Sequence, residues 1–105
     1  MSESAYVAIG RTSANTGHDL PKDQWREFQL ETRHAIEDAG GKVFFFGEGF
    51  GVWEESAEPS YVIGFATEHV NWSALRSLLW ASAVHYEQIA ISVVCSEPDF
   101  IFSAE

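Results

Sequence analysis

The chain has 105 residues, a hydrophobic fraction of 46% and a formal net charge of -10. This length predicts a single domain over residues 1–105, and the apolar fraction is that of a globular protein rather than a disordered one. The 16 acidic residues outnumber the 6 basic ones, which disfavours nucleic acid and anionic membrane surfaces as partners, because both require clustered positive charge.

Cys95 is the single cysteine, which excludes an internal disulfide and a multi-cysteine zinc site. An unpaired thiol is typical of a reducing compartment. The first residues have neither the basic nor the apolar region of a signal peptide, and no apolar run approaches the ~20 residues that cross a bilayer. We therefore expect a cytoplasmic protein.

The first half of the chain predicts a strand followed by an amphipathic helix. Residues 6–10 form a short apolar run, and a polar loop covers residues 11–20. Pro21 and Asp23 favour a helix start, and Gly40-Gly41 favours its end. The apolar stripe expected along this helix comprises Trp25, Phe28, Thr32, Ala35, Ile36 and Ala39.

The second half predicts two strands, a helix and a last strand. The strands are expected at residues 42–48, with Phe44 and Phe46 on one face, and at 61–67, separated by a turn-rich stretch over 49–59. Asn71 or Ser73 can cap the helix. Its expected core stripe is Trp72, Leu75, Leu79, Ala83 and Tyr86. The last strand is expected at 89–95, with a short edge segment at 100–102.

The element order βαββαβ predicts an α+β sandwich of the ferredoxin-like type, with a four-stranded antiparallel sheet and both helices on one face. Alternation along the strands places bulky residues under the helices. The opposite face then carries only small or weakly polar residues, namely Ala8, Gly10, Val62, Ala66, Ala90, Ser92 and Val94. Because a solvated sheet face normally carries charge, we expect this open face to pair with a second copy in a homodimer. Trp80 and Val84 flank the core stripe of the second helix; Trp80 is expected to pack at the sheet edge as part of the core, and the alternative is a role in an interface.

The sequence contains no strong catalytic or metal-binding motif. The four histidines lack the spacing of a helical zinc site, and the glycines at 47–51 are best interpreted as a hairpin turn, so we expect no metal and no cofactor. A candidate ligand loop comprises His18 and Asp19, with His69 as a second candidate base. Polar loops of this kind are, however, most often simply solvated.

The negative charge is concentrated in the second part of the chain, where nine acidic residues but only one base, Arg76, follow Lys42. Trp53 stands beside Glu54, Glu55 and Glu58 in the expected hairpin loop. An aromatic residue among carboxylates is suited to recognising a basic protein surface. The alternatives are that the acidity only keeps the domain soluble, or that the carboxylates mimic DNA phosphates.

Three short segments are similar to a known group of proteins. Tyr6-Val-Ala-Ile-Gly10, Trp25-x-x-Phe28 and Tyr86-x-Gln88-Ile89-Ala90 resemble small actinobacteriophage and actinobacterial proteins. The resemblance implies a bacterial or phage-infected cytoplasm and a role in modulating a host protein. It assigns no functional residue.

The sequence therefore favours a non-enzymatic protein-interaction module that acts through an acidic and aromatic surface on a protein partner. The alternative is a small-molecule-binding protein or minor enzyme that uses the first loop and the open sheet face.

Overall fold

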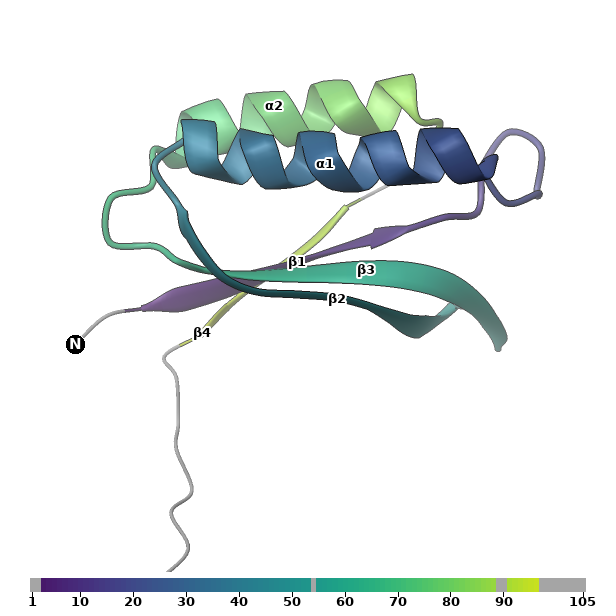
Figure 1. Cartoon of the computed structure of the whole chain (residues 1–105), viewed down its shortest axis with the longest axis horizontal. Coiled ribbons are helices and arrows are strands. Elements are labelled where there is room, and N and C mark those ends of the chain that lie inside the picture. The colour runs from purple at the N-terminus through teal and green to yellow at the C-terminus, as the bar shows by residue number, and fades with distance from the viewer. Residues whose placement is uncertain (1–2, 54, 89–90, 97–105) are drawn as a thin grey trace, which may run out of the picture.

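The computed structural model describes residues 3–53, 55–88 and 91–96, and the side chains of Trp53 and Ser96 are not described. The elements are β1 (Ser4–Gly10), α1 (Lys22–Asp38), β2 (Lys42–Trp53), β3 (Ser56–Ala66), α2 (Trp72–His85) and β4 (Ser92–Ser96). The strands form one antiparallel sheet in the order β2-β3-β1-β4, and both helices lie on the same side of it (Figure 1). The predicted ferredoxin-like α+β fold is confirmed.

Helix α1 follows the predicted pattern along its whole length. Its predicted stripe is buried from Trp25 to Ile36, and Ala39 just beyond the helix is buried as well. Thr32 is fully buried because its hydroxyl donates a hydrogen bond of 2.7 Å to the Phe28 carbonyl. The helix ends before Gly40, whose φ of +98° is readily adopted only by glycine.

Helix α2 is capped by Asn71, whose side chain accepts a hydrogen bond from the Ala74 N–H at 3.1 Å. Leu75 and Leu79 are buried against the sheet, as predicted. Trp72 was expected in the same stripe but is 42% exposed, because it stands at the first turn of the helix; its ring lies 6.3 Å from the ring of Phe65.

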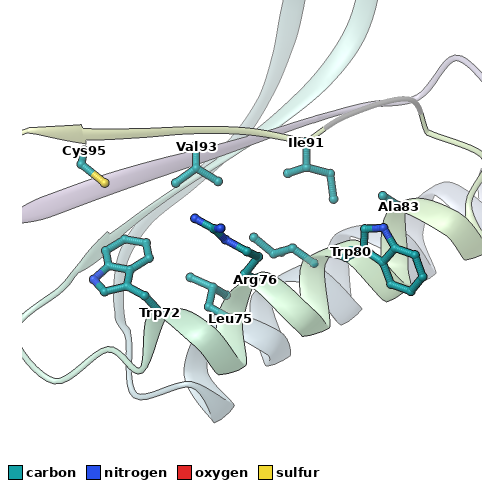
Figure 2. A pocket seen from close by; sticks show the side chains of 9 residues that line it. Trp72, Leu75, Arg76, Trp80, Ala83, Ile91, Val93 and Cys95 are labelled. Atoms are coloured by element: carbon teal, nitrogen blue, oxygen red, sulfur yellow. The ribbon is translucent and has the colours of Figure 1, made fainter.

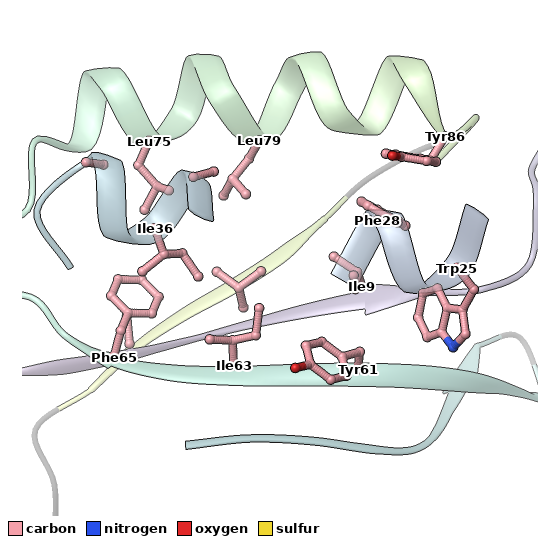
Figure 3. Packing of buried hydrophobic residues seen from close by; sticks show 14 of the residues in the cluster. Ile9, Trp25, Phe28, Ile36, Tyr61, Ile63, Phe65, Leu75, Leu79 and Tyr86 are labelled. Atoms are coloured by element: carbon pink, nitrogen blue, oxygen red, sulfur yellow. The ribbon is translucent and has the colours of Figure 1, made fainter. Parts of the chain in front are cut away.

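The hydrophobic core lies between the helices and the sheet (Figure 3). β3 contributes Tyr61, Ile63 and Phe65, all buried as the alternation predicts. Phe28 of α1 stacks on Tyr86 at the end of α2, with ring centroids 4.5 Å apart, and so links the two helices. Each large apolar side chain buried in this way stabilises the fold by about 1.5–3 kcal/mol.

Residues 49–53 and 56–59 are paired strand, so the prediction of a long turn-rich loop over 49–59 is wrong. β2 and β3 continue as a ribbon as far as Trp53 and Ser56, and its paired ends curve away from the helices (Figure 1). Pro59 is compatible with this ribbon because its carbonyl accepts the Arg11 N–H, so its backbone faces β1 and loses no bond to β2.

A β-bulge in β2 also corrects the predicted faces of the phenylalanines. The pairing with β3 shifts between Val43 and Phe45, which inserts an extra residue. Phe44 contacts Tyr6 on the open face, whereas Phe46 contacts Tyr61 on the helix-covered side. The prediction that Phe44 and Phe46 share one face is therefore wrong, and the open face carries aromatic rings as well as small residues.

β4 occupies the sheet edge beside β1. It spans Ser92–Ser96 rather than residues 89–95, and Ile89, Ala90 and the edge segment expected at 100–102 lie outside the described residues. No helix in the described part of the chain is long and apolar enough to span a membrane.

Candidate functional site

A cleft of about 570 Å³ opens between α2 and β4 (Figure 2). Side chains from the helix form one wall, and side chains from the last strand form the other. The lining residues are Trp72, Leu75, Arg76, Leu79, Trp80, Ala83, Ile91, Val93 and Cys95. Its volume falls within the ~300–1,000 Å³ typical of small-molecule sites.

The helical wall of the cleft is a single row of side chains. Trp72, Arg76 and Trp80 are four residues apart, so they lie above one another on one face of α2. Figure 2 shows the two tryptophans at the two ends of the cleft and Arg76 reaching toward β4 between them. The row thus combines two large aromatic surfaces with one cation.

The exposure of Trp80 overturns its predicted role. The side chain is 70% exposed, so the expectation that it packs at the sheet edge as core is wrong. The physical reason is its position on the helix. Leu79, the preceding residue, faces the sheet and is buried in the core, so Trp80 lies on a different side of α2. Trp80 is therefore an aromatic surface available to a ligand.

The strand wall and the floor of the cleft are apolar. Ile91, Val93 and Cys95 alternate along the chain, so all three point toward α2, as Figure 2 shows. Leu75 and Leu79 are buried beneath them. Among the lining residues that the structure describes, Arg76 is the only charged one, so the cleft is suited to an apolar group that also carries negative charge.

Of the predicted hairpin residues, Glu58 has the best-defined environment. Its carboxylate accepts the Thr12 N–H at 3.2 Å and lies so close to Gly10 that a Cβ there would stand 2.6 Å from it. Glu58 therefore holds the first loop. Glu55 is exposed in the tight turn with φ +67°, Glu54 lies outside the described residues, and only the backbone of Trp53 is described. Recognition of a protein partner by this acidic hairpin stays a prediction.

The predicted ligand loop is closed on itself. The carboxylate of Asp19 accepts the Thr12 hydroxyl at 3.1 Å, and the His18 carbonyl accepts the Ser13 N–H at 2.8 Å. Ser13 is buried and donates its hydroxyl to Glu87 at 2.5 Å, which fixes the loop to the end of α2. His18 itself is exposed.

The structure does not bring the two candidate histidines together. The backbone of His69 lies against Gly40, in the connection between β3 and α2, whereas His18 is in the loop that precedes α1 (Figure 1). These connections are at opposite ends of the helical layer. Within the described ranges, no group of three His, Cys, Asp or Glu side chains is arranged to hold a metal ion.

The sequence contained one signal for the cleft: the wide apolar arc of α2 is visible there, but Trp72 was expected in the core stripe and no ligand site was predicted at that position. Trp72-x-x-x-Arg76-x-x-x-Trp80 is a second row on α2, beside the core stripe, and it contains the only base after Lys42. Two rows of large side chains on one helix indicate more apolar surface than one sheet contact covers. The opposite wall could not be inferred, because it comes from a strand distant in the chain.

Comparisons with known proteins extend the description of the fold. No protein-family model matches the chain, and no curated protein is significantly similar in sequence. The structure of a phage SAM lyase in complex with S-methyl-5′-thioadenosine matches with a TM-score of 0.52 and 13% identity, over 91% of this chain and 81% of the lyase. A DUF3240 family protein from Shewanella baltica OS155 matches with a TM-score of 0.51 and 15% identity, over 100% of this chain and 98% of that one.

At these identities the likeness is one of fold. The first of these two structures is that of a phage enzyme, so this ferredoxin-like architecture occurs in a phage protein whose structure holds a small molecule.

Proposed function

We propose that the chain is a small-molecule-binding protein whose site is the cleft between α2 and β4. Its ligand is a small apolar or aromatic molecule that carries one anionic group. The single observation that carries this proposal is the row Trp72, Arg76 and Trp80 along an otherwise apolar cleft of about 570 Å³.

The aromatic part of the ligand accounts for most of the expected affinity. Trp72 and Trp80 are 42% and 70% exposed, so each can bury further surface against a planar group. Offset or edge-to-face aromatic contacts stabilise a complex by about 0.5–1.5 kcal/mol beyond the area that they bury. The β-branched side chains of Ile91 and Val93 add apolar contact from the strand wall.

The anionic group of the proposed ligand is inferred from the presence of Arg76 in the cleft. Its guanidinium offers five N–H donors in a planar fork that matches a carboxylate, sulfonate or phosphate. The net charge of -10 repels an anion at long range, but salt screens that repulsion beyond the Debye length of ~8 Å. Within the cleft, the nearby guanidinium therefore dominates.

A pair of dyes tests the site without knowledge of the natural ligand. 8-Anilinonaphthalene-1-sulfonate is an apolar aromatic anion, and N-phenyl-1-naphthylamine is its uncharged counterpart. We expect both to bind the full-length chain with increased fluorescence. Arg76→Gln should weaken sulfonate-dye binding about tenfold, the usual effect of losing one charge-assisted hydrogen bond, and leave the uncharged dye unchanged.

Arg26→Gln is the matched control, because Arg26 is an exposed arginine on α1 that does not line the cleft. It should leave the affinity of both dyes unchanged. Equal loss of sulfonate-dye affinity in the two variants would show a general charge effect and contradict the proposal. Unchanged affinity in Arg76→Gln would also contradict it.

S-methyl-5′-thioadenosine is a useful third probe, because it is the molecule held by the phage SAM lyase that shares this fold. It is an uncharged purine nucleoside, so its binding would depend on Trp72 and Trp80 rather than on Arg76. Displacement of the uncharged dye by this nucleoside would show that the cleft accepts a purine nucleoside.

A further inference from the structure

The sheet face that the helices leave uncovered carries an aromatic patch. Phe44 and Phe45 of β2 are 55% and 51% exposed, and Val94 of β4 is 56% exposed. Tyr6 of β1 lies between these strands and contacts Phe44 edge-to-face, with ring centroids 6.0 Å apart. Large apolar side chains from three of the four strands are thus exposed on one face. We call this the open-face patch.

The centre of this face is flat because two rings lie over a glycine. Gly64 on β3 is buried, and a Cβ there would stand 2.8 Å from the Tyr6 ring and 3.1 Å from the Phe44 ring. The rings therefore lie across the sheet over Gly64 instead of projecting away from it. A flat apolar face of this kind can stack on another sheet at the usual spacing of ~10 Å.

The open-face patch is free of charge, although the chain as a whole is strongly acidic. Pairing in the sheet places Lys42 opposite Ala66 at one end of this face, and Glu58 opposite Gly51 at the other. The paired positions between these two ends carry apolar, glycine or serine residues. An apolar centre bordered by charged residues is the usual arrangement of a protein interface.

We propose that the open-face patch binds a second copy of this chain, face to face, around a two-fold axis. Two chains that each carry a charge of -10 repel each other unless they meet through a surface without carboxylates, and the centre of this face, between Lys42 and Glu58, is such a surface. A basic partner, in contrast, would find no acidic side chain in the centre of the patch. The two-fold arrangement places identical apolar strands against each other.

The area of the face is near the lower limit for a specific interface, which indicates a weak dimer. A sheet four strands wide, with strands ~4.8 Å apart and about seven residues long, has a footprint of roughly 450 Å². Two copies together approach the ~1,000 Å² at which specific interfaces begin. We therefore expect a dimer with a dissociation constant in the micromolar range.

Sedimentation equilibrium of the full-length chain tests the dimer directly. The wild type should pass from the 11.7 kDa monomer to twice that mass as its concentration rises. Phe45→Lys and Val94→Lys place a charge on different strands of the patch, and each should raise the dissociation constant at least about tenfold. Val84→Lys is the matched control, because Val84 is 60% exposed on α2 and should leave the dimer intact.

Three results would overturn the proposal. The first is a wild type that stays monomeric to about 500 µM. The second is a dimer that both lysine variants leave unchanged while their far-ultraviolet circular dichroism shows a native fold. The third is a dimer lost in Val84→Lys, which would place the interface on the helices. Cleft occupancy does not enter this experiment, so either proposal can fail without the other.

Discussion

The two helices cover the same sheet, but α1 completes a core and α2 leaves a cleft. The stripe of α1 is buried throughout, and its tryptophan, Trp25, is only 5% exposed. On α2, Leu75 and Leu79 are equally buried, yet the neighbouring row that contains Trp80 faces open space beside β4. Tryptophans on two amphipathic helices of one small domain thus have different roles.

The width of an apolar stripe on a helix therefore indicates what the stripe contacts. A stripe that matches one sheet contact, as on α1, indicates core. A second row beside the stripe, as on α2, indicates surface that a ligand or a partner can cover.

Substitution in the core under α1 should have the largest effect on stability. Phe28 is fully buried and stacks on Tyr86, so Phe28→Ala should lower the free energy of unfolding by about 3–5 kcal/mol. Urea denaturation of the wild type and the variant measures this directly. A loss below about 1 kcal/mol would show that the side chains of α1 do not form a tightly packed core, and would contradict the contrast between α1 and α2.

Tyr86 should make stability depend on pH in the alkaline range. Its hydroxyl is buried near the Glu31 carboxylate without a hydrogen bond of good geometry to the described residues, and burial, together with that carboxylate, raises its pKa above the ordinary value of 10.0. The folded state holds this proton more tightly than the unfolded state does. The contribution of Tyr86 to the free energy of unfolding is therefore complete below pH ~10, and above that pH it falls by up to about 1.4 kcal/mol per pH unit.

Tyr86→Phe should remove this alkaline loss. It should be as stable as the wild type, or more so, at pH 7, because the variant buries no hydroxyl that lacks a well-formed hydrogen bond. Urea denaturation of both proteins between pH 9 and 11 is the measurement. If the free energy of unfolding fell equally with pH in the two proteins over that range, the alkaline loss of stability could not be assigned to Tyr86.

Glu58 should have a smaller, local effect on the first loop. Glu58→Gln weakens the hydrogen bond to the Thr12 N–H and should cost about 0.5–1 kcal/mol, with faster amide hydrogen exchange at Thr12. Glu55→Gln changes an exposed carboxylate in the same ribbon and should change neither quantity. If the two variants behave alike, Glu58 does not hold the loop.

Trp80→Ala should change stability least of all, within about 0.5 kcal/mol, because the side chain is largely exposed. Its effect should instead appear in binding, as a loss of about tenfold in affinity for the uncharged dye. Urea denaturation and dye titration of the same sample separate the two effects. A Trp80→Ala variant that unfolds as readily as Phe28→Ala would make Trp80 a core residue after all.

Local patterns were sufficient to predict the order of elements and the core of α1. The proline and glycines around α1, Asn71 before α2, and the alternation in β1 and β3 all act within a few residues of the chain. The β2 bulge could not be predicted, because a two-residue period does not reveal an extra residue until the partner strand is placed. The glycines and Pro59 indicated a loop, yet pairing with the neighbouring strand accommodates them.

The cleft was not predictable for a related reason. Its helical wall is a visible row in the sequence, but its other wall is β4, and only the sheet order places β4 beneath α2. Whether the candidate histidines act as a pair or as separate residues was also not predictable: His18 and His69 are both exposed in loops, and the fold places these two loops at opposite ends of the helical layer (Figure 1).

The most direct test of the contrast between the helices is an NMR titration of the tryptophan indole N–H groups with 8-anilinonaphthalene-1-sulfonate. Single Trp→Phe substitutions assign the four resonances. We expect saturable shifts for Trp72 and Trp80 and none for Trp25, which is buried in the core. Saturation that moves Trp25 and leaves Trp72 and Trp80 in place would contradict the assignment of the cleft as the binding site.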